Sequence, residues 1–170
     1  PGAAANSVGT YTNCTALGYN SRVTASNTIV IGNSSVTSIG GYVNWTNLSD
    51  GRFKTNVQQN IPGLAFINKL QPVTYNLKMQ ELSNFLNEDS IANPAKQNEV
   101  YSGFIAQDVE KAAQEVNYNF SGVAKPANNH SAYGLRYDDF VPSLVKAVQE
   151  LSKENEELRK RLNAFEQKLR

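Results

Sequence analysis

The chain has 170 residues and a mass of 18.7 kDa, enough for one modest domain with an appendage or for two small modules. With one cysteine, Cys14, and one histidine, His130, it cannot form an internal disulfide or a zinc or iron site with several His and Cys ligands. Its 16 basic and 15 acidic residues leave a formal net charge of +1, too little to hold nucleic acid or anionic lipid. No apolar run approaches the roughly 20 residues of a membrane-spanning helix. There is no basic-then-apolar leader and no initial Met, so we expect a soluble fragment or a processed product. We expect no metal, no cofactor, no nucleic-acid partner and no membrane insertion.

The charged residues are distributed very unevenly. Up to residue 48 the only charged side chain is Arg22, and Asn, Ser, Thr and Gly supply 26 of those 48 residues. All remaining charge lies from Asp50 onward. This change of composition predicts a module boundary near residue 48, and we expect three parts: residues 1–48, a core of residues 49–140 and a C-terminal helix of residues 141–170.

The first 48 residues contain short β-branched runs that each end in glycine, at residues 15–18, 29–32 and 36–40. This pattern is typical of very short strands with tight turns. The uneven glycine spacing suggests degenerate repeats, which need stacking or a partner chain to bury a face. Residues 16–23 and 29–36 resemble the head repeats of trimeric autotransporter adhesins, which implies a β-roll built by three chains. The alternative is a Gly/Ser/Asn-rich linker.

The C-terminal residues repeat an apolar pattern with alternating spacings of four and three, the 3.5-residue period of a coiled coil. Eleven of the 21 residues from Glu150 to Arg170 are charged and lie off this seam, so the helix is soluble only if the apolar stripe is covered. The polar Asn155 within it would set the register; alternatively, it is an ordinary surface residue on a helix packed against its own domain. The seam consists of Leu144, Val148, Leu151, Asn155, Leu158, Leu162, Phe165 and Leu169.

Ser49 and Lys54 lie five residues apart, with Asp50 and Gly51 after the serine. This spacing puts two side chains on opposite faces of a strand and about 140° apart on a helix, so they meet only if the chain turns. Asp-Gly is a strong turn signal, and a hairpin here would pair Ser49 with Arg52 and place Lys54 diagonally beside Ser49. A lysine can activate a serine hydroxyl when burial favours its neutral amine. The alternative is an ordinary turn beside a solvated lysine.

Four motifs follow one another along the chain: residues 49–57, residues 63–64 with 67–75, residues 103–110, and residues 135–140 leading into 144–151. In this order they resemble the C-terminal intramolecular chaperone domain of endosialidase and phage tailspikes, a family of serine autoproteases. The resemblance implies that Ser49 is the nucleophile, that Lys54 is its base and that the bond between Leu48 and Ser49 is cut once. Asp50, Gly51 and Arg52 would support the turn. Asp50 would shape the turn or also orient Lys54, and Arg52 would form a structural ion pair or, alternatively, donate to the oxyanion.

Members of this family trimerise, help the preceding fibre to fold and then cut themselves off. The resemblance therefore implies an α+β fold in an intertwined homotrimer, with the upstream fibre segment of the same chain as a partner. The parent fibre would bind a host-surface glycan or receptor. It would belong to a phage tail, folding in the host cytoplasm, or to a bacterial surface. The alternatives are a trimerisation or adhesion module that does not cleave and, disfavoured by the single charge in residues 1–48, a DNA-binding factor.

The remaining elements are expected to be structural. We predict a short helix around Leu64, Ile67 and Leu70, a strand at residues 72–77, and a strand at residues 103–106 followed by a helix to about Val116. Residues 83–98 are predicted to be an exposed insertion. Residues 117–133 are predicted to be a loop with His130 on the surface.

Overall fold

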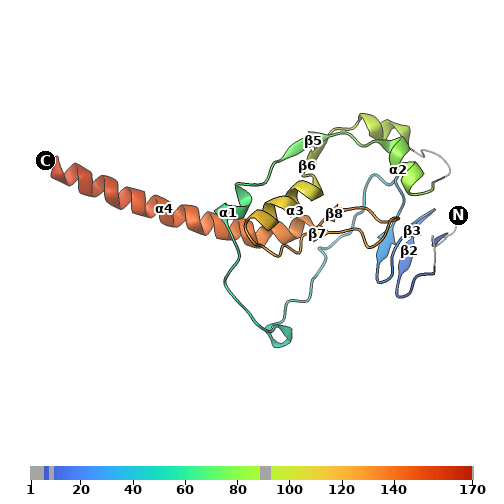
Figure 1. Ribbon diagram of the computed structural model, residues 1–170, viewed down its shortest axis with the longest axis horizontal. Helices are drawn as coiled ribbons and strands as arrows, with labels where there is room; N and C mark the ends of the chain where they lie inside the picture. The colour runs from blue at the N-terminus through green and yellow to red at the C-terminus, as the bar shows by residue number, and fades with distance from the viewer. Residues whose placement is uncertain (1–5, 8–9, 89–92, 170) are drawn as a thin grey trace. The chain divides into compact units, whose positions relative to one another are not determined.

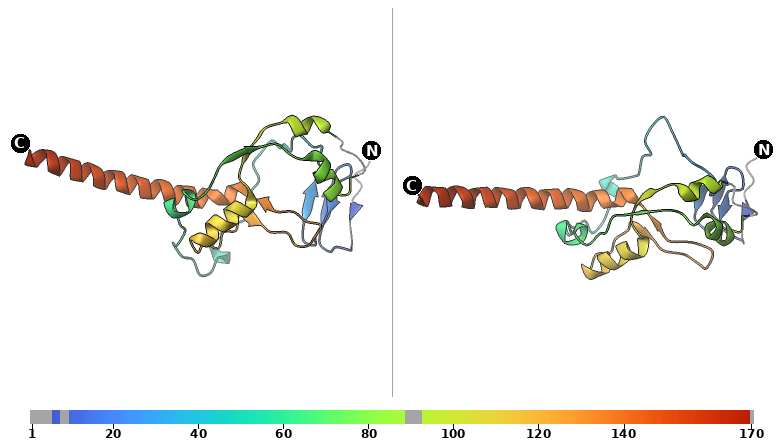
Figure 2. Two further views of the ribbon diagram at one scale, coloured as in Figure 1. Left: turned by 45° about the horizontal axis from the view of Figure 1, so that its top comes forward. Right: turned by 90° about the horizontal axis from the view of Figure 1, so that it is seen from above.

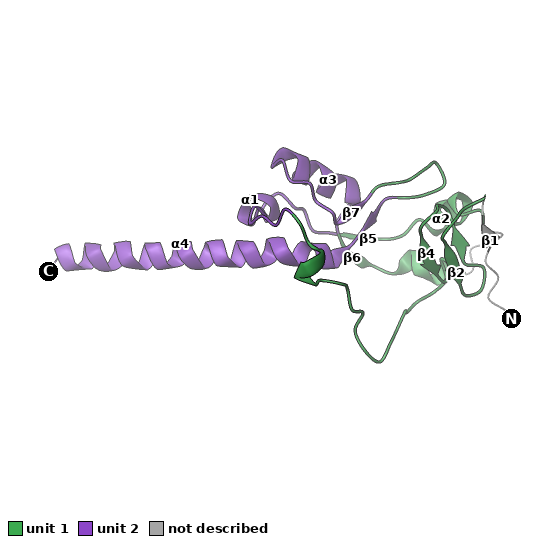
Figure 3. Ribbon diagram, turned by 90° about the horizontal axis from the view of Figure 1, so that it is seen from below, with its two compact units in different colours: residues 1–55, 74–103, 125–132 green, residues 56–73, 104–124, 133–170 purple. Residues whose placement is uncertain are grey.

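The computed structural model describes residues 6–7, 10–88 and 93–169. Short strands and short helices precede one long C-terminal helix (Figure 1), which confirms the predicted α+β class. The chain divides into two compact units, each made of three segments (Figure 3). Unit 1 contains residues 1–55, 74–103 and 125–132, and unit 2 contains residues 56–73, 104–124 and 133–170.

The N-terminal part of unit 1 consists of stacked repeats. Strand β1 (Asn6–Ser7) pairs in parallel with β3 (Arg22–Val23), and β2 (Thr15–Leu17) pairs in parallel with β4 (Ile29–Ile31). The partners in the second pair are 14 residues apart, the same offset that separates the hydrogen-bonded side chains of Asn13 and Asn27. Both asparagines have a positive φ, which asparagine tolerates better than most residues.

Two of the three predicted strands in this region are present. The runs at residues 15–18 and 29–32 form β2 and β4, and each ends at a glycine with positive φ. The strand predicted at residues 36–40 is wrong, because the Val36 amide bonds to the Asn33 carbonyl in a turn. The three-chain β-roll remains a prediction.

The rest of unit 1 contains short elements. Strand β5 (Val73–Tyr75) pairs with β6 (Tyr101–Gly103), and the rings of Tyr75 and Tyr101 stack with their centroids 5.8 Å apart. Helix α2 (Met79–Phe85) and the 3-10 helix η2 (Pro94–Asn98) follow β5. The predicted exposed insertion at residues 83–98 is therefore wrong in part: Ser83 is buried near the end of α2, where its hydroxyl donates to the Glu88 carboxylate. Residues 89–92 of that prediction lie outside the described residues.

Unit 2 is built around a cluster of aromatic rings. Its elements are α1 (Leu64–Ile67), α3 (Ala106–Glu115), β7 (Val123–Ala124), the antiparallel β8 (Gly134–Leu135) and the 3-10 helix η3 (Tyr137–Phe140). The Phe120 ring lies 5.0 Å from that of Phe66 and 4.8 Å from that of Phe140. All three rings are buried with Val109, Ala112 and Ala113 of α3. Because residues 117–133 contain β7 and the buried Phe120, the prediction of a simple loop is wrong, although His130 is exposed as predicted.

Helix α4 (Val141–Lys168) packs against α1 at its N-terminal end. Gly63, which precedes α1, permits this contact, because a Cβ atom there would lie 2.7 Å from the Ala147 amide nitrogen. The Leu64 amide donates to the Glu150 carboxylate of α4 at 2.8 Å. The C-terminal part of α4 extends beyond the other elements of unit 2 (Figure 2). Among the described residues, no helix combines the length and the apolar character that a membrane crossing requires.

Candidate active site

A 3-10 turn brings Ser49 and Lys54 together. Residues 33–50 form no helix or strand, and the turn η1 (Gly51–Phe53) follows them. The Phe53 amide donates to the Asp50 carbonyl at 3.1 Å, and the Lys54 amide donates to the Gly51 carbonyl at 3.2 Å. The backbone thereby folds back far enough for Lys54 Nζ to donate to Ser49 Oγ at 2.7 Å.

The predicted hairpin at Asp50-Gly51 is wrong. A two-residue hairpin turn of the Asp-Gly type needs a positive φ at both central residues, and neither Asp50 nor Gly51 has one. Asp50 instead caps the 3-10 turn, because its Oδ1 atom accepts from the Arg52 amide at 2.9 Å. The spacing of five residues brings the serine and the lysine together through this turn, not through strand pairing.

The Asp50–Arg52 ion pair fixes the shape of the turn. Arg52 Nη2 lies 2.6 Å from Asp50 Oδ2, and Arg52 Nε lies 3.0 and 3.1 Å from the two carboxylate oxygens. This forked contact raises the pKa of Arg52 and, with the Arg52 amide bond, holds the pKa of Asp50 below its ordinary range. The guanidinium also lies over the Phe53 ring, 5.7 Å from its centroid. Both charged groups are therefore engaged within the turn.

Acidification is expected to weaken the cap on this turn. Because the folded chain lowers the pKa of Asp50 from its ordinary value of 3.8, the cap contributes fully above pH 3.8 and is lost as the pH falls through the lowered pKa. An NMR titration of the Arg52 amide should therefore have a midpoint below 3.8. The midpoint should rise in Arg52→Gln, and a native midpoint at or above 3.8 would contradict this account.

The Ser49–Lys54 pair is exposed to solvent in this chain, as are the apolar side chains close to it in the sequence. The relative exposure is 81% for Leu48, 71% for Phe53 and 78% for Val57. A lysine acts as a base in its neutral form, which burial favours. The geometry for activating the serine is thus present, whereas the desolvation that a general base requires is not supplied by the described part of this chain.

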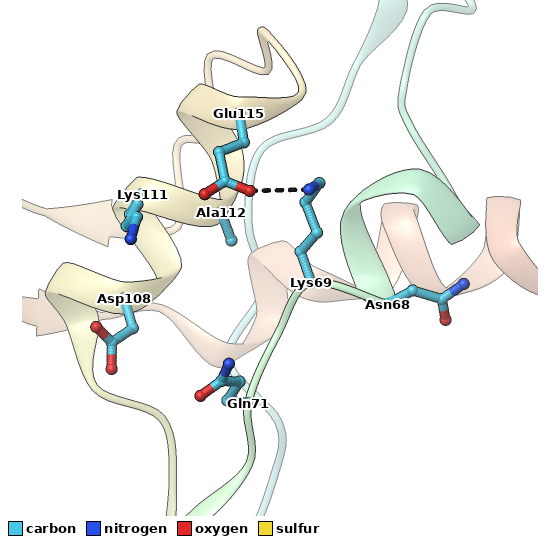
Figure 4. Close-up of a pocket in the computed structure, with 7 residues that line it drawn as sticks. All are labelled: Asn68, Lys69, Gln71, Asp108, Lys111, Ala112 and Glu115. Atoms are coloured by element: carbon cyan, nitrogen blue, oxygen red, sulfur yellow. Dashed lines mark hydrogen bonds and ion pairs between the residues drawn. The ribbon is translucent and has the colours of Figure 1, made fainter.

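A polar pocket in unit 2 is a weaker candidate (Figure 4). Its volume is about 410 Å³, and Lys69 Nζ bonds across it to Glu115 Oε2 at 2.8 Å. This bond lowers the pKa of Glu115. No sequence pattern pointed to the pocket, because its residues come from two separate segments, α3 and the stretch after α1. None of the lining residues is a serine, threonine, cysteine or histidine that could act as a nucleophile. The lining consists of Asn68, Lys69, Gln71, Asp108, Lys111, Ala112 and Glu115.

The seam residues predicted from the heptad pattern lie on α4, with Leu169 at its C-cap. Their period of 3.5 residues places them along one stripe of the helix. All eight are exposed in the single chain, including Val148 at 64%. The Asn155 side chain donates to the Leu151 carbonyl within the same helix at 2.9 Å. The stripe is therefore available to another chain.

A comparison with known protein families finds a match over part of the chain. Residues 49–118 match the model of a peptidase family described as the chaperone of endosialidase, which confirms the predicted resemblance over that range. The matched range begins at Ser49 and includes Lys54. No curated protein and no solved structure matches the chain.

Proposed function

We propose that the part of the chain whose residues 49–118 match the endosialidase chaperone model assembles as a trimer, assists the upstream segment and then cuts the bond between Leu48 and Ser49. The observation that carries the proposal is the 2.7 Å contact between Lys54 Nζ and Ser49 Oγ at the first residue of the matched range. The change in charge near residue 48 supports the same boundary. The upstream part is then residues 1–48, the core is residues 49–140, and the trimeric coil is residues 141–170.

The proposed reaction has two steps. Neutral Lys54 takes the proton from Ser49 Oγ, which bonds to the carbonyl carbon of Leu48. The peptide C–N bond breaks, and Lys54 returns the proton to the nitrogen of Ser49. Water then adds to the resulting ester, whose cleavage releases a carboxylate on Leu48 and restores the hydroxyl of Ser49, now the N-terminal residue. Because the serine attacks its own preceding carbonyl, each chain reacts once.

The turn limits which groups stabilise the oxyanion on Leu48. The amides of Arg52, Phe53 and Lys54 already donate inside the turn, and the guanidinium of Arg52 is bound to Asp50. The three amides are therefore not free oxyanion donors, and the guanidinium is held at Asp50 through its Nε and Nη2 atoms. The stabilising N–H groups come from elsewhere, and a water-excluded position would increase their effect.

We propose that assembly provides this position. Leu48 and Phe53, each next to one residue of the dyad in the sequence, expose apolar surface, which a second copy of the chain would cover. Their burial would remove water from Lys54 and favour its neutral amine. The exposed seam on α4 supplies the means to bring copies together. Cleavage would then occur after correct association and would indicate that the trimer has formed.

The family supports a chaperone role, a partner in the upstream fibre and a phage-tail context. We propose that the parent protein is a tail fibre or tailspike, or a related bacterial surface fibre, with a host-surface glycan or receptor as its ligand. The stacked repeats within residues 12–33 support a fibre-like upstream segment.

Intact-mass spectrometry of the purified and folded chain tests the cleavage. We expect two products whose masses correspond to residues 1–48 and 49–170, formed at a rate independent of protein concentration once the trimer is complete. A chain that forms trimers and keeps its full mass would instead be the non-cleaving trimerisation module.

A further inference from the structure

Arg22, the only charged residue in the first 48 positions, contacts the distant segment that follows α2. Its Nη1 atom donates to the carbonyls of Leu86, at 3.3 Å, and of Asn87. Leu86 is the C-cap of α2, where backbone carbonyls lack partners within the helix. A cation is favourable at such an end. The one charge of the upstream segment is thus used to bind residues on the other side of the proposed cleavage point.

Glu88, which follows α2, in turn binds a residue of the upstream segment. Its Oε1 atom accepts from the Ser34 amide at 3.2 Å, and its Oε2 atom accepts from the Ser34 hydroxyl. The buried Ser83 of α2 donates to the same carboxylate at 3.4 Å and orients it. Hydrogen bonds to a charged acceptor are stronger than those between neutral groups.

Lys96 binds the turn that contains Ser34, at residues 33–36. Its Nζ atom donates to the Ser34 carbonyl at 2.8 Å and to the Val36 carbonyl at 2.9 Å. This turn depends on repeat stacking, because the Asn33 side chain donates to the Tyr19 carbonyl of the preceding repeat at 3.1 Å. Glu88 and Lys96 therefore bind backbone groups that adopt this arrangement when the last repeat has stacked.

We propose that Arg22, Glu88 and Lys96 form a polar clamp that recognises the folded end of the repeats and holds residues 1–48 to residues 49–170 after the backbone is cut. The partner of residues 49–170 is thus the folded upstream product, recognised mainly through its backbone. The second part of this proposal, that residues 1–48 are retained after the cut, rests on the proposed cleavage. The contacts are charge-assisted, so salt and loss of charge weaken them, and release of the product is a separate step from cutting.

Size-exclusion chromatography after complete cleavage tests the retention. In the native chain the two products should elute together at low salt and separate as salt rises. Glu88→Gln should weaken their association about tenfold, the order expected from weakening charge-assisted bonds. The matched control is Glu115→Gln, because Glu115 pairs with Lys69 inside residues 49–170. Equal retention in the two variants would overturn the clamp.

A second experiment does not depend on cleavage. In full-length Ser49→Ala, hydrogen exchange across residues 30–37 should be about tenfold faster when Glu88→Gln or Lys96→Gln is added, but unchanged when Glu115→Gln is added. Unchanged exchange in both clamp variants would overturn the clamp whether or not the chain cuts itself. Faster exchange in these variants, together with a native chain that never cuts, would support recognition of the repeats and exclude cleavage.

Discussion

Ser49→Ala is expected to leave the chain at its full mass while its trimer still forms. The substitution removes the oxygen that attacks the Leu48 carbonyl and leaves the Asp50–Arg52 turn in place. Lys54→Arg is the sharper variant. Arginine keeps the positive charge and a donor for Ser49, but a guanidinium stays protonated and cannot act as a base. We expect both variants to slow cleavage at least about a hundredfold, the lower range for losing general-base catalysis.

Lys69→Arg is the matched control, because Lys69 likewise bonds to a side-chain oxygen, at 2.8 Å, but lies in the polar pocket of unit 2. Its cleavage rate should equal the native rate. The measurement is intact mass against time after refolding, with the oligomeric state followed in parallel. Native-rate cleavage by Lys54→Arg would show that the lysine only positions the serine, and native-rate cleavage by Ser49→Ala would remove Ser49 as nucleophile.

Local sequence patterns predicted the parts of this fold that depend on nearby residues. The 3.5-residue period predicted the helix that became α4, because that period describes one face of a helix without reference to any other segment. The β-branched runs ending in Gly18 and Gly32 predicted β2 and β4 in the same way. Proximity of Ser49 and Lys54 was also predicted, but through a hairpin, because the pattern did not show that Asp50 would cap the Arg52 amide.

Features that depend on distant residues were not predictable from the sequence. The contacts of Arg22 span 64 and 65 residues, and those of Ser34 with Glu88 span 54. The polar composition of residues 83–98 suggested an exposed insertion, whereas that composition partly reflects the charged and polar groups that contact the repeats. A lone charge in a neutral segment was the available signal, but no local pattern identifies backbone carbonyls as its partners.

The double variant Leu158→Glu/Leu162→Glu is expected to convert the assembly to monomers and to slow cleavage at least about tenfold. Each exposed seam leucine gains roughly 1.5–3 kcal/mol when it is fully buried, and a carboxylate there would be buried without a partner. The turn at residues 50–54 lies far along the chain from both positions, so its internal hydrogen bonds stay intact. Loss of cleavage would therefore reflect the exposed state of Ser49 and Lys54 in a single chain.

Ala164→Glu is the matched control, because it adds the same side chain to the same helix at an exposed position off the seam. It should sediment as a trimer and cut at the native rate. Sedimentation velocity gives the oligomeric state, and intact mass gives the extent of cleavage in the same sample. If the double variant is monomeric and still cuts at the native rate, the dyad works without neighbouring chains and assembly does not control it. If the double variant stays trimeric, the stripe on α4 is not the interface, and the surface around Leu48 and Phe53 becomes the next place where copies would meet.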